Sequence, residues 1–196
     1  TAESILPPNM PGHRGKAGTY AFNPQAARQL LGNTTLPPIE LVWGGQSQDG
    51  KKTADGIVVQ LIQNLGIKAS VRQLDWPTFL HRATNQQLGF FVGSWYADYL
   101  DPENFLSVTL SSYGQNRVAY DNPRFTELCR QADTMTDPVK RIELYQLAET
   151  LVLEDAVWIP LYFERTYLAV KPRLSGLRRN LMGFLPHNQV SIQADK

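Results

Sequence analysis

The sequence predicts an α/β fold with a mixed, largely parallel sheet and flanking helices. Two observations carry this prediction. From residue 23 to residue 95, segments with apolar residues at helical spacing alternate with short apolar runs typical of strands. Strands separated by helices favour parallel pairing, and right-handed crossovers would place the helices against the faces of the sheet.

The first half of the chain is predicted to alternate helix and strand after an irregular start. Residues 1–19 are rich in Pro and Gly and are expected to have little core of their own. Asn23 and Pro24 indicate an N-cap followed by Pro at the first helical position, and Gly32 can close that helix. The elements that follow are a strand at 39–43, a helix at 53–65, a strand at 67–74, a helix capped by Asp75 and a strand at 88–95.

The next part of the chain is predicted to be helical, and its helix starts share one signature. Asp101, Asn122 and Asp137 each precede a proline. The Asx oxygen accepts hydrogen bonds from the first turn, where the missing N–H of Pro has no consequence. The predicted helices begin at 102, 123 and 138 and end near 106–108, 133 and 154. Strands are expected at 156–163 and 166–170, with a weaker candidate at 190–193.

Composition and charge exclude several classes of function. The chain has 196 residues and a net charge of +1, without a Lys/Arg block, which disfavours nucleic-acid binding. No apolar run approaches the roughly 20 residues that span a bilayer. The chain opens at Thr1 without Met, which is consistent with a processed or truncated N-terminus.

The reactive residue types do not form a recognisable catalytic or metal set. The single cysteine, Cys129, lies on the apolar face of a predicted helix and is expected to be a buried structural thiol. The three histidines are far apart and lack metal-ligand spacing. We therefore expect no metal, no cofactor, no catalytic residues and no enzymatic activity.

The most informative segment is GSWYADYLDPEN at 93–104, which follows an expected strand. Asp101 is accounted for as a helix cap, and Glu103 as an acid in the first helical turn. Asp98 is left without a structural role, although a hydrogen-bonded structural Asp is the competing interpretation. A carboxylate beside Trp95 suits a small cation such as an ammonium group, and ligands lie at strand ends in open α/β sheets.

A series of short motifs then occurs in order along nearly the whole chain. The motifs are LPP at 6–8, NP at 23–24, LGIK at 65–68, WYADYLDP at 95–102, NFL at 104–106, YDNPRF at 120–125 and EDAVWIPLY at 154–162. Each is weak alone, but the ordered series is specific. With these motifs the sequence resembles the family 5 extracellular solute-binding proteins, the dipeptide- and oligopeptide-binding components of ABC importers.

The resemblance implies a two-lobe periplasmic binding protein fold that closes over a ligand. Residues 1–163 would form the C-terminal lobe, incomplete at its N-terminal side. Residues 164–196 would be a tail that returns to the missing N-terminal lobe. The implied partners are a peptide or other small solute, the permease subunits of the importer, and that lobe; self-association through the tail is an alternative. The implied location is periplasmic or extracellular, with lipid anchoring through the missing N-terminus as one arrangement.

The resemblance also assigns ligand-binding positions. The family's acidic residue that binds a peptide's N-terminal ammonium matches Asp98, and Trp95 matches a position in the cleft wall. Tyr162 falls at the second crossing between the lobes, and Asn116 is a further match. Arginines that bind a peptide's C-terminus in some members are not matched, and Arg82 lies only in their general region.

Two other functions remain open from the residues. One is a ligand-sensing domain of a transcriptional regulator built on the same lobe. The other is a small hydrolase that would use Asp98 and Glu103 as a carboxylate pair, about 5–9.5 Å apart. The identity of the solute is open as well, because relatives of this kind also take nickel chelates and sugars.

Overall fold

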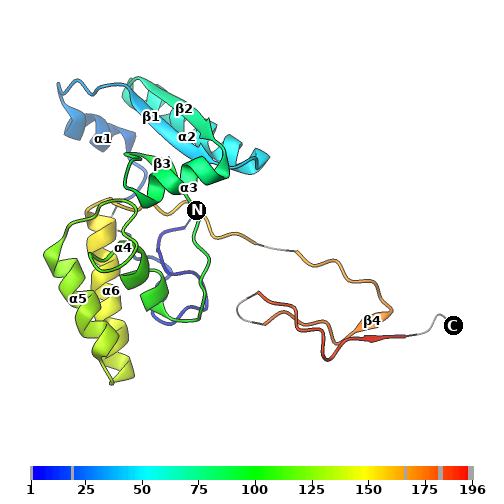
Figure 1. Ribbon diagram of the computed structural model, residues 1–196. Coiled ribbons are helices and arrows are strands. Elements are labelled where there is room, and N and C mark those ends of the chain that lie inside the picture. The colour runs from blue at the N-terminus through cyan, green and yellow to red at the C-terminus, as the bar shows by residue number, and fades with distance from the viewer. Residues whose placement is uncertain (1, 19, 166, 181–182, 194–196) are drawn as a thin grey trace.

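A three-stranded parallel sheet lies at one end of the molecule (Figure 1). The computed structural model describes residues 2–18, 20–165, 167–180 and 183–193. In the sheet, β1 (Ile39–Gly44) lies between β2 (Ala69–Leu74) and β3 (Phe91–Val92), and both pairings are parallel. The sheet with its flanking helices confirms the predicted α/β class.

Helices cover both faces of this sheet because side chains alternate along β1. Leu41 and Trp43 pack against α2 (Gln48–Leu65) on one face. Val42 points to the other face and packs against α3 (Trp76–Thr84). The Asp75 cap of α3 is confirmed by its bond from the Thr78 amide, whereas α2 begins five residues before its predicted start, behind a Ser47 cap. The short helix α1 (Pro24–Leu31) has its predicted Asn23 cap, but it buries none of its side chains.

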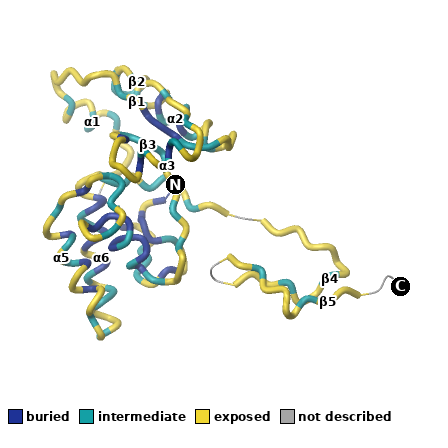
Figure 2. Tube along the Cα trace, in the orientation of Figure 1, coloured by how far each residue is buried: buried dark blue, intermediate teal, exposed yellow. Residues whose placement is uncertain are grey.

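A second, mostly helical unit lies below the sheet in Figures 1 and 2 and contains the largest core. Its elements are the 3-10 helix η1 (Pro102–Asn104), α4 (Ser107–Leu110), α5 (Pro123–Thr134) and α6 (Pro138–Glu154). All three predicted Asx-Pro starts are confirmed, because each Asx side chain accepts a hydrogen bond from the first turn. The fully buried side chains of α5 and α6 include Phe125, Cys129, Ala132, Tyr145, Ala148 and Val152.

The N-terminal segment is irregular as predicted, and its buried side chains join the core of the helical unit instead of forming a core of their own. Ile5, Leu6 and Met10 are buried in the core of the helical unit. Their backbone is held there by Glu149 of α6, whose Oε1 accepts hydrogen bonds from the amides of Ile5 and Leu6 at 2.8 and 3.1 Å. A contact across more than 140 residues leaves no local pattern in the sequence.

Two predicted strands are shorter than expected or are not formed. The strand expected at 88–95 is reduced to β3, which pairs with β1 only at Val42 and Trp43. Residues 156–163 form no strand, although Leu161 O accepts a hydrogen bond from the amide of Ala2. The run at 88–92 was predicted as a buried strand, and Leu88 is buried while Phe90, Phe91 and Val92 are half-buried. The run at 156–163 has no strand beside it in the described part of the chain, and strand formation needs such a partner, which sequence pattern does not supply.

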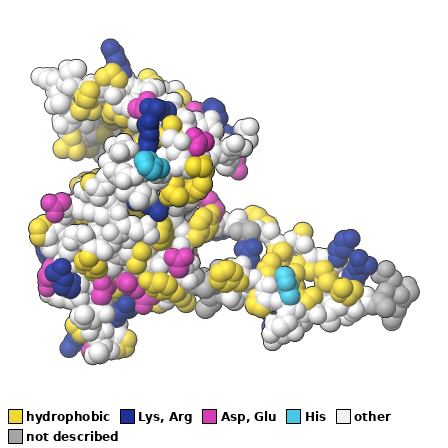
Figure 3. Space-filling model, viewed as in Figure 1, with side chains coloured by type: hydrophobic (Ala, Val, Ile, Leu, Met, Phe, Trp, Pro, Cys, Tyr) yellow, Lys and Arg dark blue, Asp and Glu magenta, His cyan; other side chains and the backbone are white. Residues whose placement is uncertain are grey.

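The tail extends away from the rest of the molecule, and most of it is exposed (Figure 2). It contains a short antiparallel pair, β4 (Leu174–Ser175) with β5 (Ser191–Ile192), so the candidate at 190–193 is confirmed in part. Of the strand expected at 166–170, Thr166 lies outside the described residues and the remainder forms no strand. Hydrophobic side chains are visible along the tail in Figure 3. The predicted unburied tail residues Leu181 and Met182 lie outside the described residues.

Cys129 should be unreactive in the folded protein. It is fully buried, as predicted, and burial raises the pKa of its thiol to about 12, so that little thiolate forms near neutral pH. We expect negligible reaction with Ellman's reagent at pH 8 in buffer and one equivalent of reaction in concentrated urea. Rapid stoichiometric labelling without urea would show that the helical core opens easily.

Candidate ligand-binding site

The chain leaves the sheet after β3 and forms an irregular loop at residues 93–100, followed by η1. Asp101 begins η1, and its Oδ1 accepts a hydrogen bond from the Glu103 amide at 2.9 Å, as predicted for a cap. Arg141 of α6 also binds the Asp101 carboxylate through both terminal nitrogens, at 2.7 and 3.0 Å. This bidentate ion pair ties η1 to α6, and sequence reasoning did not find it because Arg141 is 40 residues away.

Asn104, the last residue of η1, brings two of the predicted site residues together. Its side-chain oxygen accepts a hydrogen bond from Trp95 Nε1 at 2.9 Å and another from the Asp98 amide at 3.2 Å. Asn104 is only 1% exposed. One buried oxygen therefore fixes both the indole of Trp95 and the backbone of Asp98.

The carboxylate of Asp98 is exposed. Among the residues that the structure describes, it has no hydrogen-bond or ion-pair partner. The neighbouring carboxylates differ: Asp101 is bound by Arg141, and Glu103 accepts a hydrogen bond from the Tyr99 hydroxyl at 2.8 Å. Asp98 is thus the acid of this segment that is available to a ligand.

The indole of Trp95 is half-buried and is linked to the Asp98 backbone through their shared acceptor, the Asn104 oxygen. It packs against the core of the helical unit. The guanidinium carbon of Arg117 lies 5.8 Å from the ring centroid, within the range of a cation–π contact. In the described part of the chain the buried Nε of Arg117 has no hydrogen-bond partner.

Tyr162 lies in the segment that passes beside the loop. It is 52% exposed and lies close enough to Tyr96 to contribute slightly to the raised pKa of that tyrosine. The Tyr96 hydroxyl donates a hydrogen bond to the Glu164 carboxylate. This bond, together with burial, raises the pKa of Tyr96 to about 12 by favouring the protonated phenol. Residues 162–164 are therefore joined to the loop that carries Asp98.

The side chain of Asn116 is used within its own loop. Its Nδ2 donates to Tyr120 O at 2.9 Å, and its Oδ1 accepts from the Tyr120 amide at 2.8 Å. Asn116 has a φ of 38°, in the left-handed region that Asn tolerates better than most residues. These bonds shape the loop that carries Arg117 to Trp95.

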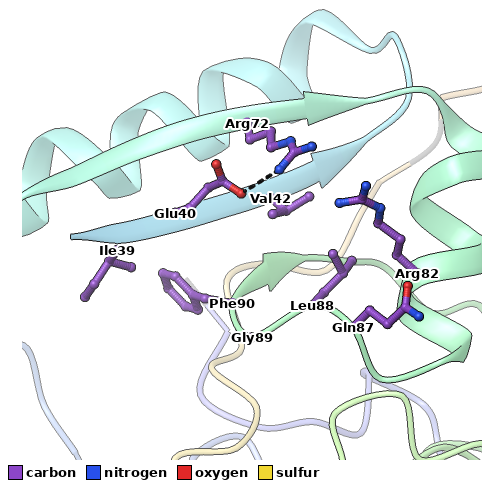
Figure 4. Close-up of a pocket in the computed structure, with 9 residues that line it drawn as sticks. All are labelled: Ile39, Glu40, Val42, Arg72, Arg82, Gln87, Leu88, Gly89 and Phe90. Atoms are coloured by element: carbon purple, nitrogen blue, oxygen red, sulfur yellow. Dashed lines mark hydrogen bonds and ion pairs between the residues drawn. The ribbon is translucent and has the colours of Figure 1, made fainter. Parts of the chain in front are cut away.

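An open cavity of about 380 Å³ lies on the α3 face of the sheet (Figure 4). Within the described ranges the guanidinium of Arg82 makes no hydrogen bond or ion pair, whereas Arg72 pairs with Glu40 at 3.3 Å. The lining residues are Ile39, Glu40, Val42, Arg72, Arg82, Gln87, Leu88, Gly89 and Phe90. The residues at 87–90 precede β3, whereas the Asp98 loop follows it, so the cavity and the loop lie toward opposite ends of this strand.

The described residues contain neither a metal-binding cluster nor a helix able to span a membrane. No group of three or more His, Cys, Asp or Glu side chains in this part of the chain could hold a metal ion. None of its helices combines the length and the apolar character needed to cross a membrane.

Comparison with known proteins defines the class. Residues 1–117 match the model of the bacterial extracellular solute-binding proteins, family 5 Middle. The chain is 27% identical over 200 residues to "Probable di/tripeptide-binding protein 5" of Pseudomonas aeruginosa (strain UCBPP-PA14), covering 98% of this chain and 38% of the relative. It is 26% identical over 202 residues to "Heme-binding protein A" of Haemophilus influenzae, covering 98% of this chain and 37% of the relative.

A solved structure agrees with this assignment at the level of the fold. The dipeptide-binding protein from Pseudoalteromonas sp. SM9913, in complex with Met-Leu, matches with a TM-score of 0.81 at 24% identity, over 98% of this chain and 40% of that structure. The chain belongs to the family 5 bacterial extracellular solute-binding proteins. It spans well under half the length of these relatives. Family membership does not favour the regulator or the hydrolase interpretation.

Proposed function

We propose that this chain forms one side of the ligand cleft of a peptide-binding protein that serves an ABC importer. The observation that carries the proposal is the exposed carboxylate of Asp98, which has no partner among the described residues and whose backbone shares a buried acceptor, the Asn104 oxygen, with the Trp95 indole. Asp98 accepts the N-terminal ammonium of the peptide, and Trp95 forms the adjacent wall. Tyr162 faces the same cleft from the crossing segment. Asn116 contributes indirectly, because it shapes the loop that carries Arg117.

Closure of the cleft would strengthen this ion pair. A carboxylate loses favourable hydration when it is covered, and a bound ammonium offsets that loss. The aromatic face of Trp95 adds an attraction for the same cation. Main-chain groups of a short peptide would meet the irregular backbone of the loop, so the charge selects the peptide terminus while side-chain selectivity comes from elsewhere in the cleft.

The proposed organisation has residues 1–163 as the C-terminal lobe and residues 164–196 as a tail that packs on an N-terminal lobe outside this sequence. The exposure of large apolar side chains in the tail supports this, for example Tyr167 at 87% and Ile192 at 71%. Such side chains normally mark an interaction surface when they are grouped. The complete protein would work in the periplasm or outside the cell with permease subunits, as expected for a family 5 extracellular solute-binding protein.

Replacement of Asp98 tests the ligand assignment. In a two-lobe protein that contains this chain, Asp98→Ala should weaken binding of a short peptide by at least about tenfold, or about 1.4 kcal/mol, because a buried ammonium loses its partner. Isothermal titration calorimetry measures this directly. Asp121→Ala removes an exposed carboxylate and should leave the affinity unchanged.

The peptide supplies a second control. An N-acetylated peptide lacks the ammonium, so Asp98→Ala should affect its affinity far less than that of the free peptide. Equal affinities of the parent and Asp98→Ala for the free peptide would exclude the proposed role of Asp98. The isolated chain should bind weakly, since it offers one side of the cleft, and micromolar binding by it would contradict the proposed organisation.

A further inference from the structure

We propose that Asn104 is a positioning residue for ligand binding, which holds the loop of Asp98 in its binding geometry without touching the ligand. This inference rests on the function proposed above. The juxtaposition that carries it is a single buried side-chain oxygen that accepts two hydrogen bonds, from Trp95 Nε1 and from the Asp98 amide.

Both acceptor positions of that oxygen are used, as a side-chain carbonyl allows. The bond to Trp95 fixes the orientation of the indole, and the bond to Asp98 fixes the backbone from which the carboxylate projects. In the described ranges, the Asp98 bond is the one hydrogen bond made by the backbone of residues 95–98. Removal of Asn104 would therefore free this stretch of backbone.

The position of Asn104 is itself fixed from the helical unit. It ends η1, whose first turn is capped by Asp101, and Asp101 is bound at two points by Arg141. Arg141 also donates from Nε to Ala132 O of α5 at 3.1 Å. A continuous set of contacts thus runs from α5 and α6 through η1 to the ligand-facing carboxylate.

The consequence is preorganisation. A loop that is already held in the bound conformation loses less conformational freedom when the ligand arrives, so it binds more tightly than a mobile loop with the same groups. Asp98 supplies the charge in this arrangement, and Asn104 supplies its placement.

Nuclear magnetic resonance of the full 196-residue chain tests the geometry without a ligand. The variant Asn104→Ala should shift the indole N–H signal of Trp95 and the amide signal of Asp98 and speed their exchange with water; Trp95→Phe assigns the indole signal. Asn104→Asp retains an acceptor oxygen, so exchange of both N–H groups with water should stay slower than in Asn104→Ala, although the buried charge shifts both signals. Asn122→Ala is the matched control, because the side-chain oxygen of Asn122 also accepts two N–H hydrogen bonds, but at the start of α5. Unchanged Trp95 and Asp98 signals in Asn104→Ala, or equal changes in Asn122→Ala, would overturn the proposal.

Affinity measurements in a two-lobe protein that contains this chain complete the test. Asn104→Ala should weaken peptide binding by about tenfold, whereas Asn122→Ala should have little effect on binding. If Asn104→Ala frees the loop and leaves the affinity intact while Asp98→Ala weakens it, the positioning role is wrong but the proposed function stands. If Asp98→Ala also leaves the affinity intact, the proposed function fails, even though the loop signals still report how Asn104 holds the loop.

Discussion

Replacing Glu149 by Ala should destabilise the folded chain by about 3–5 kcal/mol, because it breaks a buried charged network from one side. The carboxylate is fully buried. Its Oε2 is 2.8 Å from Nη2 of Arg14, and its Oε1 accepts the amides of Ile5 and Leu6. In the variant, those two amides lose their acceptor, and the guanidinium of Arg14 loses its counter-ion.

Urea unfolding followed by circular dichroism measures this loss. The control is Glu143→Ala, on an exposed position of the same helix, which should change the stability by less than about 0.5 kcal/mol. The double variant Arg14→Ala/Glu149→Ala should lose less than the sum of the two single variants, since the two side chains share one interaction. A loss below about 1 kcal/mol for Glu149→Ala would mean that the N-terminal segment is not anchored to α6 as described.

The helix starts were predictable because their causes are local. Each predicted Asx cap forms within three residues of its proline, so the sequence contains both partners side by side. The ends of α1 and α2 at Gly32 and Gly66 follow for the same reason, since each glycine has a positive φ. The parallel sheet was predictable from the alternation of helix and strand alone.

The contacts that assemble the core were not predictable in this way. Glu149 has the spacing of a helical core position, and the sequence gives no indication that its partners are the amides of Ile5 and Leu6. β3 pairs with β1 at only two residues although β1 continues on both sides of them, and the run at 156–163 lacks a neighbouring strand. Propensity identifies a segment that can pair, whereas pairing depends on what the rest of the chain brings next to it.

In the candidate site, too, the residues with local signals were predictable and the residue that supports them was not. Asp98 was singled out by elimination, because Asp101 and Glu103 already had local roles. Trp95 was singled out because it lies three residues before Asp98 in the same segment. Their common support, Asn104, was visible only as part of the NFL motif, because an amide at the end of a short helix has no distinctive pattern. Its supporting role is visible only in the structure, where one Asn104 oxygen accepts hydrogen bonds from both the Trp95 indole and the Asp98 amide.

Arg141 should contribute strongly to the stability of the fold by tying η1, which ends at Asn104, to α6. Replacing it by Ala should reduce the stability by about 2–3 kcal/mol, because a charged, bidentate hydrogen-bonded pair is lost together with the packing of the side chain. The pair is partly shielded: 21% of the Arg141 side chain and 30% of the Asp101 side chain are exposed. The guanidinium also lies 4.9 Å from the ring centroid of Tyr145, within cation–π range, which a lysine at this position would match poorly.

A double-mutant cycle with Arg141→Ala and Asp101→Ala separates the pair from the other contacts of Arg141. We expect a coupling energy of at least about 1 kcal/mol from urea unfolding of the parent, the two single variants and the double variant. The exposed pair of Arg130 with Glu127, at 3.3 Å on α5, is the matched control and should give less than about 0.5 kcal/mol. If both pairs give the same small coupling, the Asp101–Arg141 pair does not fix η1, and the support of the Asp98 loop must come from Asn104 and its packing alone. A large coupling energy for Asp101–Arg141 alone would show that η1, which ends at Asn104, the support of the Asp98 loop, is held in place from α6.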